Sequence, residues 1–313
     1  MVSWQTRIIG FCLLWLVACG GPPVQKQIPI SMGIRLDDEV NWTQQQQDLQ
    51  AAQRLGIRRW MLEVPVLFNT QKQNLYIDSI VYQRFKLIHT HLVDQKLPYG
   101  IQFTHVREAD WATAVNTVGD SALLAEWQAT VQRFLSTEVV QGTEPHWIVL
   151  GQDMIGVDGA QHLGQWDRFC SSLRSQLPLT KLVYATLPAR VLKVGIWQAF
   201  DGVGVRYMRA GIENPRAYAR QMHKQIDSVA AHYQKPIYLT AANLMGPHKK
   251  YQFLNLTRFW PGQPVALLNL NTIYGISPLS DTQSPYSWQG DVAIREAVKD
   301  YIEDQPSTIS LRQ

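Results

Sequence analysis

The sequence predicts an α/β fold of the (β/α)₈ barrel type. Strand-like and helix-like segments alternate eight times between residues 31 and 302. Several of the strand-like segments are unbroken apolar runs, which is typical of parallel strands buried on both faces. Eight such units over about 270 residues fit a (β/α)₈ barrel. The main alternative is an open doubly wound sheet, but the Gly-rich phosphate turn of that fold is missing after the first strand.

The eight expected strands are bounded by Gly, Pro or polar residues. They span residues 31–35, 57–64, 99–103, 146–150, 182–186, 202–207, 237–240 and 265–270. The expected helices carry apolar residues near the 3.6-residue period. They span residues 42–55, 77–95, 121–140, 163–176, 188–200, 215–233, 247–255 and 291–302. No break in composition divides them, so we expect one barrel domain over residues 31–305 and a C-terminal tail at 306–313.

The first residues have the pattern of an export signal. Arg7 is followed by an apolar run that ends in Ala18 and Cys19. A positive region, about ten apolar residues and a small-residue cleavage point form a secretory signal, and the run is too short to span a membrane. Leu-Val-Ala-Cys resembles the lipobox of bacterial lipoproteins. The resemblance implies removal of residues 1–18, lipidation of Cys19 and a tether over residues 19–30.

The residue after Cys19 is not Asp, which in such lipoproteins favours anchoring in the outer membrane. The domain would then face the periplasm or the cell surface. Partners expected are the membrane lipid, a glycan and another envelope protein, whereas a formal charge of +4 without a Lys or Arg run argues against nucleic acid.

Cysteine usage excludes a disulfide framework. Cys12 leaves with the signal and Cys19 is committed to lipid, so Cys170 is alone. Cys170 lies on an apolar helix face and is expected to be buried. No Cys/His spacing suggests zinc, and we expect neither a metal nor another cofactor.

Polar residues stand where the expected strands end, which is the catalytic end of a (β/α)₈ barrel. The candidate catalytic carboxylates are Glu63 and Asp153. The candidate ligand-binding residues are Arg35, Asp37, His105, Gln152, Arg206, Tyr207, Asn243, Asn271, Tyr274 and Trp288. Aromatic faces beside amides and carboxylates suit a sugar ring, although any barrel of this kind carries some polar residues there for structural reasons.

Three of these strand ends resemble the retaining (β/α)₈ glycoside hydrolases with paired glutamates, most closely glycoside hydrolase family 113 and its relatives. The family has Gly-Asn-Glu after its fourth strand, with Glu as the general acid/base; this chain has Gly151-Gln152-Asp153. Its seventh strand ends in Thr-Glu, with Glu as the nucleophile; this chain has Thr240-Ala241. An Asp of its sixth strand is matched by an Arg.

These departures bear on activity. Retaining hydrolysis needs two carboxyl groups about 5 Å apart, and the methyl group of Ala241 cannot form a glycosyl-enzyme intermediate. Asp153 is one methylene shorter than Glu. A cation at Arg206 would pair with Asp153 or Glu63 and lower the pKa of that carboxyl, which opposes general-acid catalysis.

Three hypotheses follow. The first is a catalytically degenerate, carbohydrate-binding lipoprotein built on a glycosidase barrel. The second is an active glycoside hydrolase with the relocated pair Glu63 and Asp153, or with Asp37 as a partner, acting by the inverting mechanism. The third is a structural or assembly lipoprotein of the outer membrane without a sugar ligand.

Overall fold

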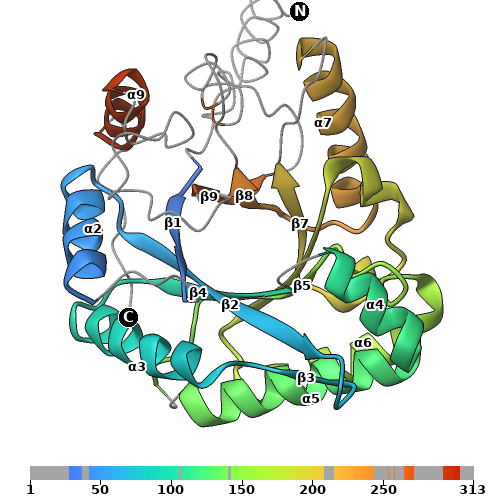
Figure 1. Ribbon diagram of the computed structural model, residues 1–313. Coiled ribbons are helices and arrows are strands. Elements are labelled where there is room, and N and C mark those ends of the chain that lie inside the picture. Colours follow the sequence, from blue (N-terminus) through green and yellow to red (C-terminus); the bar gives the residue numbers. More distant parts are fainter. Residues whose placement is uncertain are drawn as a thin grey trace, which may run out of the picture.

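The computed structural model describes residues 28–36, 42–105, 108–139, 142–207, 215–242, 253, 257, 264–270 and 292–303. Within them, eight parallel strands form a closed barrel with helices packed around it, which confirms the predicted (β/α)₈ fold (Figure 1). The order around the barrel is β1, β2, β4, β5, β6, β7, β8 and β9. β1 pairs in parallel with both β2 and β9, so the ring has no open edge.

The elements agree well with the expected ones. The barrel strands are β1 (Ile30–Arg35), β2 (Arg59–Asn69), β4 (Tyr99–His105), β5 (Trp147–Gln152), β6 (Lys181–Thr186), β7 (Gly202–Tyr207), β8 (Ile237–Ala242) and β9 (Val265–Leu270). The described helices are α2 (Trp42–Arg54), α3 (Ser79–Asp94), α4 (Glu108–Val118), α5 (Asp120–Glu138), α6 (Leu163–Gln176), α7 (Pro215–His232) and α9 (Val292–Glu303). The helix expected at residues 247–255 lies, except for Phe253, outside the described residues.

The prediction of a helix at residues 188–200 was wrong. Two short 3₁₀ turns take its place, η2 (Pro188–Lys193) and η3 (Trp197–Ala199). Gly195 interrupts the segment and packs tightly against the 3₁₀ turn η1 (Ala160–His162), which lies between β5 and α6. An added Cβ at Gly195 would lie 2.4 Å from the Ala160 nitrogen. The ammonium of Lys235 donates to the carbonyls of Trp197, Gln198 and Phe200. Tertiary contacts therefore override the helical pattern here.

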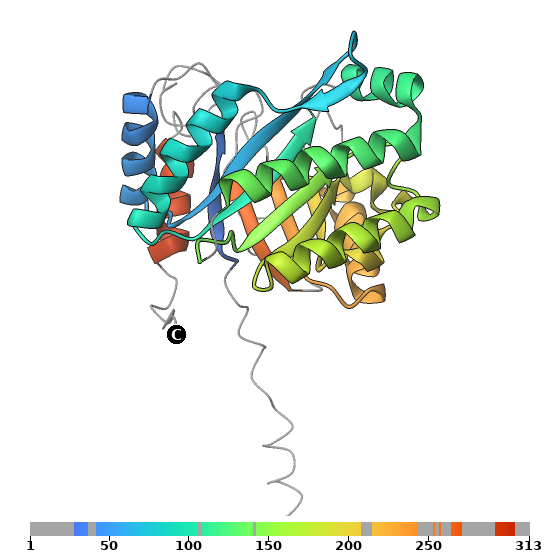
Figure 2. The ribbon, with the colours of Figure 1, turned by 90° about the horizontal axis from the view of Figure 1, so that it is seen from below.

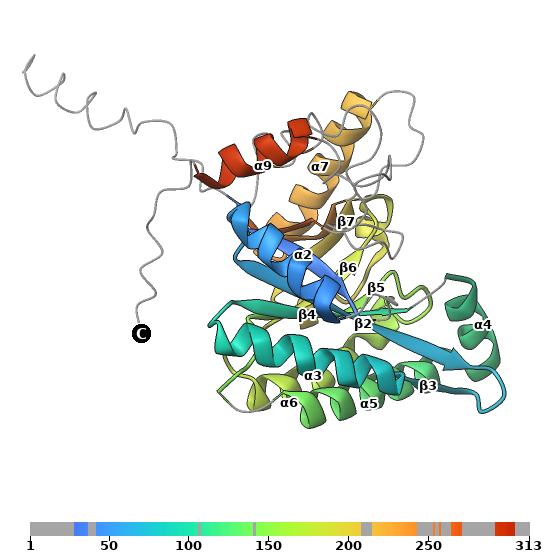
Figure 3. The ribbon, with the colours of Figure 1, turned by 60° about the vertical axis from the view of Figure 1, so that its left-hand side comes forward.

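The second strand continues five residues past its expected end and turns back. β3 (Asn74–Tyr76) pairs with it antiparallel, and the hairpin projects beyond the barrel (Figures 2 and 3). Asn69 begins the turn, because its side-chain oxygen accepts from the N–H groups of Gln71 and Lys72. α4 follows β4 and was also not expected. Both additions extend the C-terminal end of the barrel, where the predicted site lies.

The core has two layers. Inside the barrel, one apolar cluster fills the space between the strands; it comprises Met61, Trp147, Val149, Val183, Ala185, Tyr238 and Leu267. A larger cluster lies between the strands and the helices. There the buried indoles of Trp127, Trp166 and Trp197 donate to backbone carbonyls. Cys170 is fully buried in this layer, as predicted, and burial raises its pKa to about 12. None of the described helices is long and apolar enough to cross a bilayer.

The inward face of β7 depends on glycine. A Cβ at Gly204 would lie 2.4 Å from the Tyr184 carbonyl oxygen and 2.9 Å from the Ala185 Cα, which are backbone atoms of β6. We expect Gly204→Ala to lower the free energy of unfolding by about 1–3 kcal/mol in urea denaturation, because neither strand can move without breaking the ladder.

Gly164→Ala is the matched control. Gly164 lies in the first turn of α6, and an added Cβ there meets no atom within 4 Å. This change should be neutral or stabilise by up to about 1 kcal/mol, since Ala is the better helix former. Equal effects of the two substitutions would contradict the described barrel packing.

α7 contributes a pH dependence. His223 is buried, and burial lowers its pKa to about 4, whereas an unfolded chain has about 6.5. As the pH falls, the unfolded state therefore binds a proton on His223 before the folded state does. The stability of the fold with a neutral His223 is complete above pH 6.5 and is progressively lost as the pH falls toward 4. Between about pH 7 and pH 5, the wild type should lose about 2 kcal/mol more than His223→Gln. Parallel pH profiles in chemical denaturation would contradict this assignment.

Candidate functional site

Asp153 occupies the first position after β5, at the C-terminal mouth of the barrel. Its backbone is left-handed, with φ of 48°, a conformation in which Asp is enriched but which remains uncommon outside glycine. The Asp153 N–H donates to the Ala185 carbonyl, and its own carbonyl accepts from Ile155. This turn directs the side chain toward the ends of β6 and β7.

Both oxygens of the Asp153 carboxylate are bonded. Oδ1 accepts from the Thr186 hydroxyl at 2.9 Å and from the Leu187 N–H at 2.7 Å. Oδ2 accepts from the Arg206 guanidinium at 2.7 Å. The side chain is only 3% exposed, and Arg190 Nη1 lies 3.8 Å from Oδ1. The predicted pairing of Arg206 with one of the two candidate carboxylates is thus present, and the partner is Asp153.

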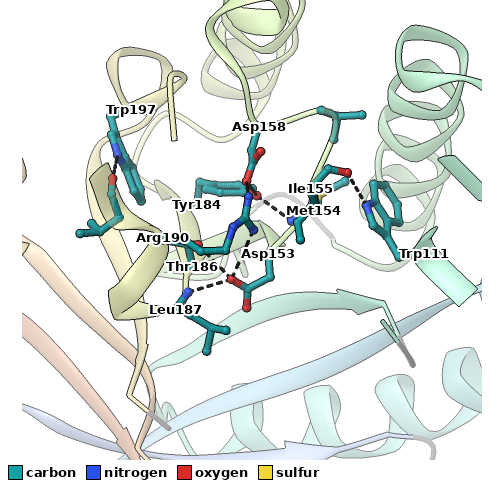
Figure 4. A network of polar contacts seen from close by, with 12 residues as sticks. Trp111, Asp153, Met154, Ile155, Asp158, Tyr184, Thr186, Leu187, Arg190 and Trp197 are labelled. Atoms are coloured by element: carbon teal, nitrogen blue, oxygen red, sulfur yellow. Dashed lines mark hydrogen bonds and ion pairs between the residues drawn. The ribbon is translucent and has the colours of Figure 1, made fainter. Parts of the chain in front are cut away.

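Arg190 links Asp153 to a second buried carboxylate (Figure 4). Its Nη2 donates to Asp158 Oδ2 at 2.8 Å, and the Tyr184 hydroxyl donates to the same oxygen at 3.1 Å. The Tyr184 hydroxyl in turn accepts from the Met154 N–H. Burial raises the pKa of Asp158 more than Arg190 and Tyr184 lower it, and burial raises the pKa of Tyr184 well above its usual value. These groups connect the loop after β5 to η2.

A row of polar side chains lies on the inner barrel wall beside Asp153. Met61 belongs to the inner cluster, so Glu63, two residues on, shares the inward face of β2. In the strand register, Glu63 lies opposite Arg35 of β1 on one side and opposite Gln102 of β4 on the other. Gln102 donates to the Gln152 amide oxygen at 3.1 Å. The barrel therefore brings Arg35, Glu63 and Gln152 together at its C-terminal end, as expected.

Gln102, Arg190 and Asp158 were not predicted as site residues. Gln102 is 2% exposed, and no hydrogen-bond partner of its Oε1 is found in the part of the chain that the structure describes. The sequence marked Gln102 only by placing a single amide side chain within the apolar run of β4. Arg190 was assigned to a helix that does not form, and Asp158 lies in a loop without a pattern.

His105 was expected just after this strand; it is the last residue of β4, which continues two residues past its expected end. Its ring stacks on that of Trp111 with centroids 5.5 Å apart. Trp111 is 4% exposed and donates to the Ile155 carbonyl. A buried indole that is bonded to the backbone and covered by an imidazole supports the loop after β5, and it offers no open face to a sugar.

The remaining predicted positions divide into two groups. Ala241 lies in β8, is 4% exposed and faces Arg206 in register. Cys19, Asp37, Asn243, Asn271, Tyr274 and Trp288 lie outside the described residues, as does the Tyr207 side chain at the end of β7. Among the described side chains, no group of three or more His, Cys, Asp or Glu residues could hold a metal ion.

No family model matches the chain, and no curated protein matches its sequence. Solved structures do resemble it. A glycoside hydrolase family 113 β-1,4-mannanase has a TM-score of 0.69 at 12% identity, over 89% of this chain and 99% of its own. The family 113 β-mannanase of Alicyclobacillus acidocaldarius has 0.63 at 12%, over 90% and 98%. The endo-β-1,4-mannanase of Thermotoga petrophila has 0.64 at 11%, over 94% and 79%.

The chain has the same TIM-barrel fold as these glycoside hydrolases. The resemblance to family 113 expected from the strand ends is confirmed for the fold. At 11–12% identity the likeness shows the fold.

The Asp153–Arg206 pair predicts a stability effect. Either Asp153→Asn or Arg206→Gln leaves buried donors or a buried charge without its partner and should cost about 3 kcal/mol in chemical denaturation. The double substitution should cost about 1–3 kcal/mol less than the two effects added together, because it removes one shared interaction.

Asp110→Asn is the control, since Asp110 is an exposed residue of α4 and should change stability by less than about 0.5 kcal/mol. A catalytic carboxylate held in readiness for substrate often destabilises its protein, and removing it then stabilises the fold. An Asp153→Asn variant as stable as the wild type would therefore contradict the structural role described here.

Proposed function

We propose that this protein is a lipid-anchored, carbohydrate-binding protein of the bacterial cell envelope whose glycosidase barrel has lost hydrolysis. The observation that carries the proposal is the occupation of both Asp153 oxygens by donors of the protein itself. The lipid anchor is proposed from Cys19 and the export pattern before it.

A general acid must present a proton to the leaving oxygen, and a general base must present a lone pair to water. Asp153 turns Oδ2 to the Arg206 guanidinium and Oδ1 to a hydroxyl and an N–H. A proton for the glycosidic oxygen would have to sit on an oxygen that these donors already engage, so it would compete with a charge-assisted or a buried hydrogen bond. The contacts thus favour a carboxylate that holds the strand ends together.

The position that resembles the family's nucleophile points the same way. Ala241 offers a methyl group, and its neighbour in β7 is Arg206. A retaining mechanism requires two carboxyl groups across the scissile bond. A barrel with a methyl group in one position and an internally paired Asp in the other can bind a sugar without cleaving it.

The polar row supplies groups suited to sugar hydroxyls. Amides both donate and accept, carboxylates accept from hydroxyls, and guanidinium groups donate in a fixed fork. All three kinds of group lie along the neighbouring strands β1, β2, β4 and β5. They are the guanidinium of Arg35, the carboxylate of Glu63 and the amides of Gln102 and Gln152. Because similar barrels are described as β-1,4-mannanases, β-1,4-linked glycans are the first ligands to test.

An active enzyme is the second candidate. Glu63 favours it, because its register on β2 places this carboxylate on the inward face at the C-terminal end of the barrel. Paired with Asp153, it would act in an inverting mechanism, which tolerates carboxyls about 6.5–9.5 Å apart. That mechanism would require Asp153 to leave Arg206 when substrate binds.

One experiment separates the candidates. Purified protein is incubated with β-1,4-mannan and β-1,4-glucan oligosaccharides and with peptidoglycan fragments, and both binding and released reducing ends are measured. We expect binding without release, and weaker binding for Glu63→Gln than for the control Asp110→Asn. Release that disappears in Asp153→Asn would establish the enzyme instead. If the protein shows no binding and no release, a scaffold protein is favoured.

A further inference from the structure

The chain enters the barrel at a fixed point. Ile28 is buried, and its N–H donates to the Tyr301 hydroxyl at 2.7 Å. The Pro29 carbonyl accepts from Leu268 at 2.9 Å. These bonds hold the start of β1 at the N-terminal ends of the barrel strands. Figure 2 shows this end opposite the β2–β3 hairpin and the mouth.

The distance from Cys19 to that point is short. Nine residue steps separate Cys19 from Ile28, and a fully extended chain of this length spans about 30 Å. A lipid on Cys19 would therefore hold the N-terminal end of the barrel beside the bilayer. Asp153 and the polar row lie at the other end of the strands.

The chemistry of this end fits a membrane surface. We define the N-terminal rim as the described loops 55–58, 95–98, 142–146, 177–180 and 233–236, together with Lys181. Its exposed charged residues are Arg58, Lys96 and Lys181. The acidic neighbours are Asp94 and the half-buried Glu144 and Asp201, and Asp201 is paired with Arg174. Leu179 projects from the same rim with 82% of its surface exposed.

We propose that the N-terminal rim binds anionic lipid headgroups and orients the barrel with its mouth away from the membrane. The tether argument rests on the lipid anchor of the proposed function, whereas the charges and Leu179 belong to the rim itself. Stable membrane attachment commonly combines an acyl anchor with a basic surface. Lys and Arg would contact phosphates while Leu179 enters the interfacial layer, as apolar side chains do between basic ones.

The test places an environment-sensitive dye at either end. Leu179→Cys labels the rim, and Ile155→Cys labels the mouth, where Ile155 is 59% exposed after β5. Cys170 does not interfere, because it is fully buried and its pKa is raised to about 12. Lipidated protein that begins at Cys19 is reconstituted into vesicles of phosphatidylethanolamine with phosphatidylglycerol, and quenching by nitroxides on the lipid tails is measured.

We expect the dye at position 179 to shift to the blue and to be quenched several-fold more than the dye at position 155. Lys96→Glu with Lys181→Glu should reduce this difference, whereas Lys72→Glu with Lys193→Glu, exposed on the hairpin turn and η2, should leave it unchanged. Equal quenching at the two positions, or equal effects of the two charge reversals, would overturn the proposal.

A second arm separates the rim from the anchor. The same dye variants of a chain that begins at Gly20 are mixed with vesicles of phosphatidylcholine alone or with phosphatidylglycerol added. Every described strand and helix of the barrel lies within this chain, because the first of them begins at Ile30. A response at position 179 that requires phosphatidylglycerol supports the rim even if mass spectrometry finds no lipid on Cys19. No response in this arm, together with unlipidated full-length protein, would overturn it.

Discussion

Closure of the strand ring is the constraint from which the other features follow. β1 must pair with β2 on one side and with β9 on the other, and the ring leaves only a narrow interior. Large side chains such as Trp147 and Tyr238 fill it near the N-terminal ends, and they fit because glycines face them: added Cβ atoms at Gly100 and Gly202 would meet those two rings. The apolar filling forces polar inward positions to the other end, where the strands open toward solvent.

The polar end of the barrel carries a buried carboxylate whose hydrogen bonds are made within the protein. In a hydrolase, a carboxylate at the end of the fourth barrel strand has to keep one oxygen available for the substrate. In this chain the donors of Thr186, Leu187 and Arg206 take both oxygens. These contacts join the ends of β5, β6 and β7, and the left-handed backbone of Asp153 directs its carboxylate toward them.

Much of this could be read from the sequence because it depends on local patterns. Apolar runs identified all eight barrel strands, and the strand ends pointed to Glu63, Gln152, Asp153 and Arg206. The 3₁₀ turns after β6 could not be found in this way. Their conformation depends on Lys235, which is distant in sequence, and on the close contact between Gly195 and Ala160.

The network around Asp158 was missed for a similar reason. The roles of Asp158 and Arg190 arise only when two loops meet, and Gln102 gains its meaning from a neighbouring strand. Patterns along the chain report burial and periodicity, but they do not report which polar atoms meet across the barrel.

The compact link between β6 and β7 has a consequence for how the molecule assembles. Only residues 187–201 separate these two paired strands, which is the shortest connection between neighbouring strands of the described barrel. A shorter loop loses less chain entropy when its ends meet, and contacts close in sequence form early. The β6–β7 corner is therefore the expected nucleus of the barrel. The pairing of β1 with β9, which lies more than two hundred residues away, is the contact expected to form last.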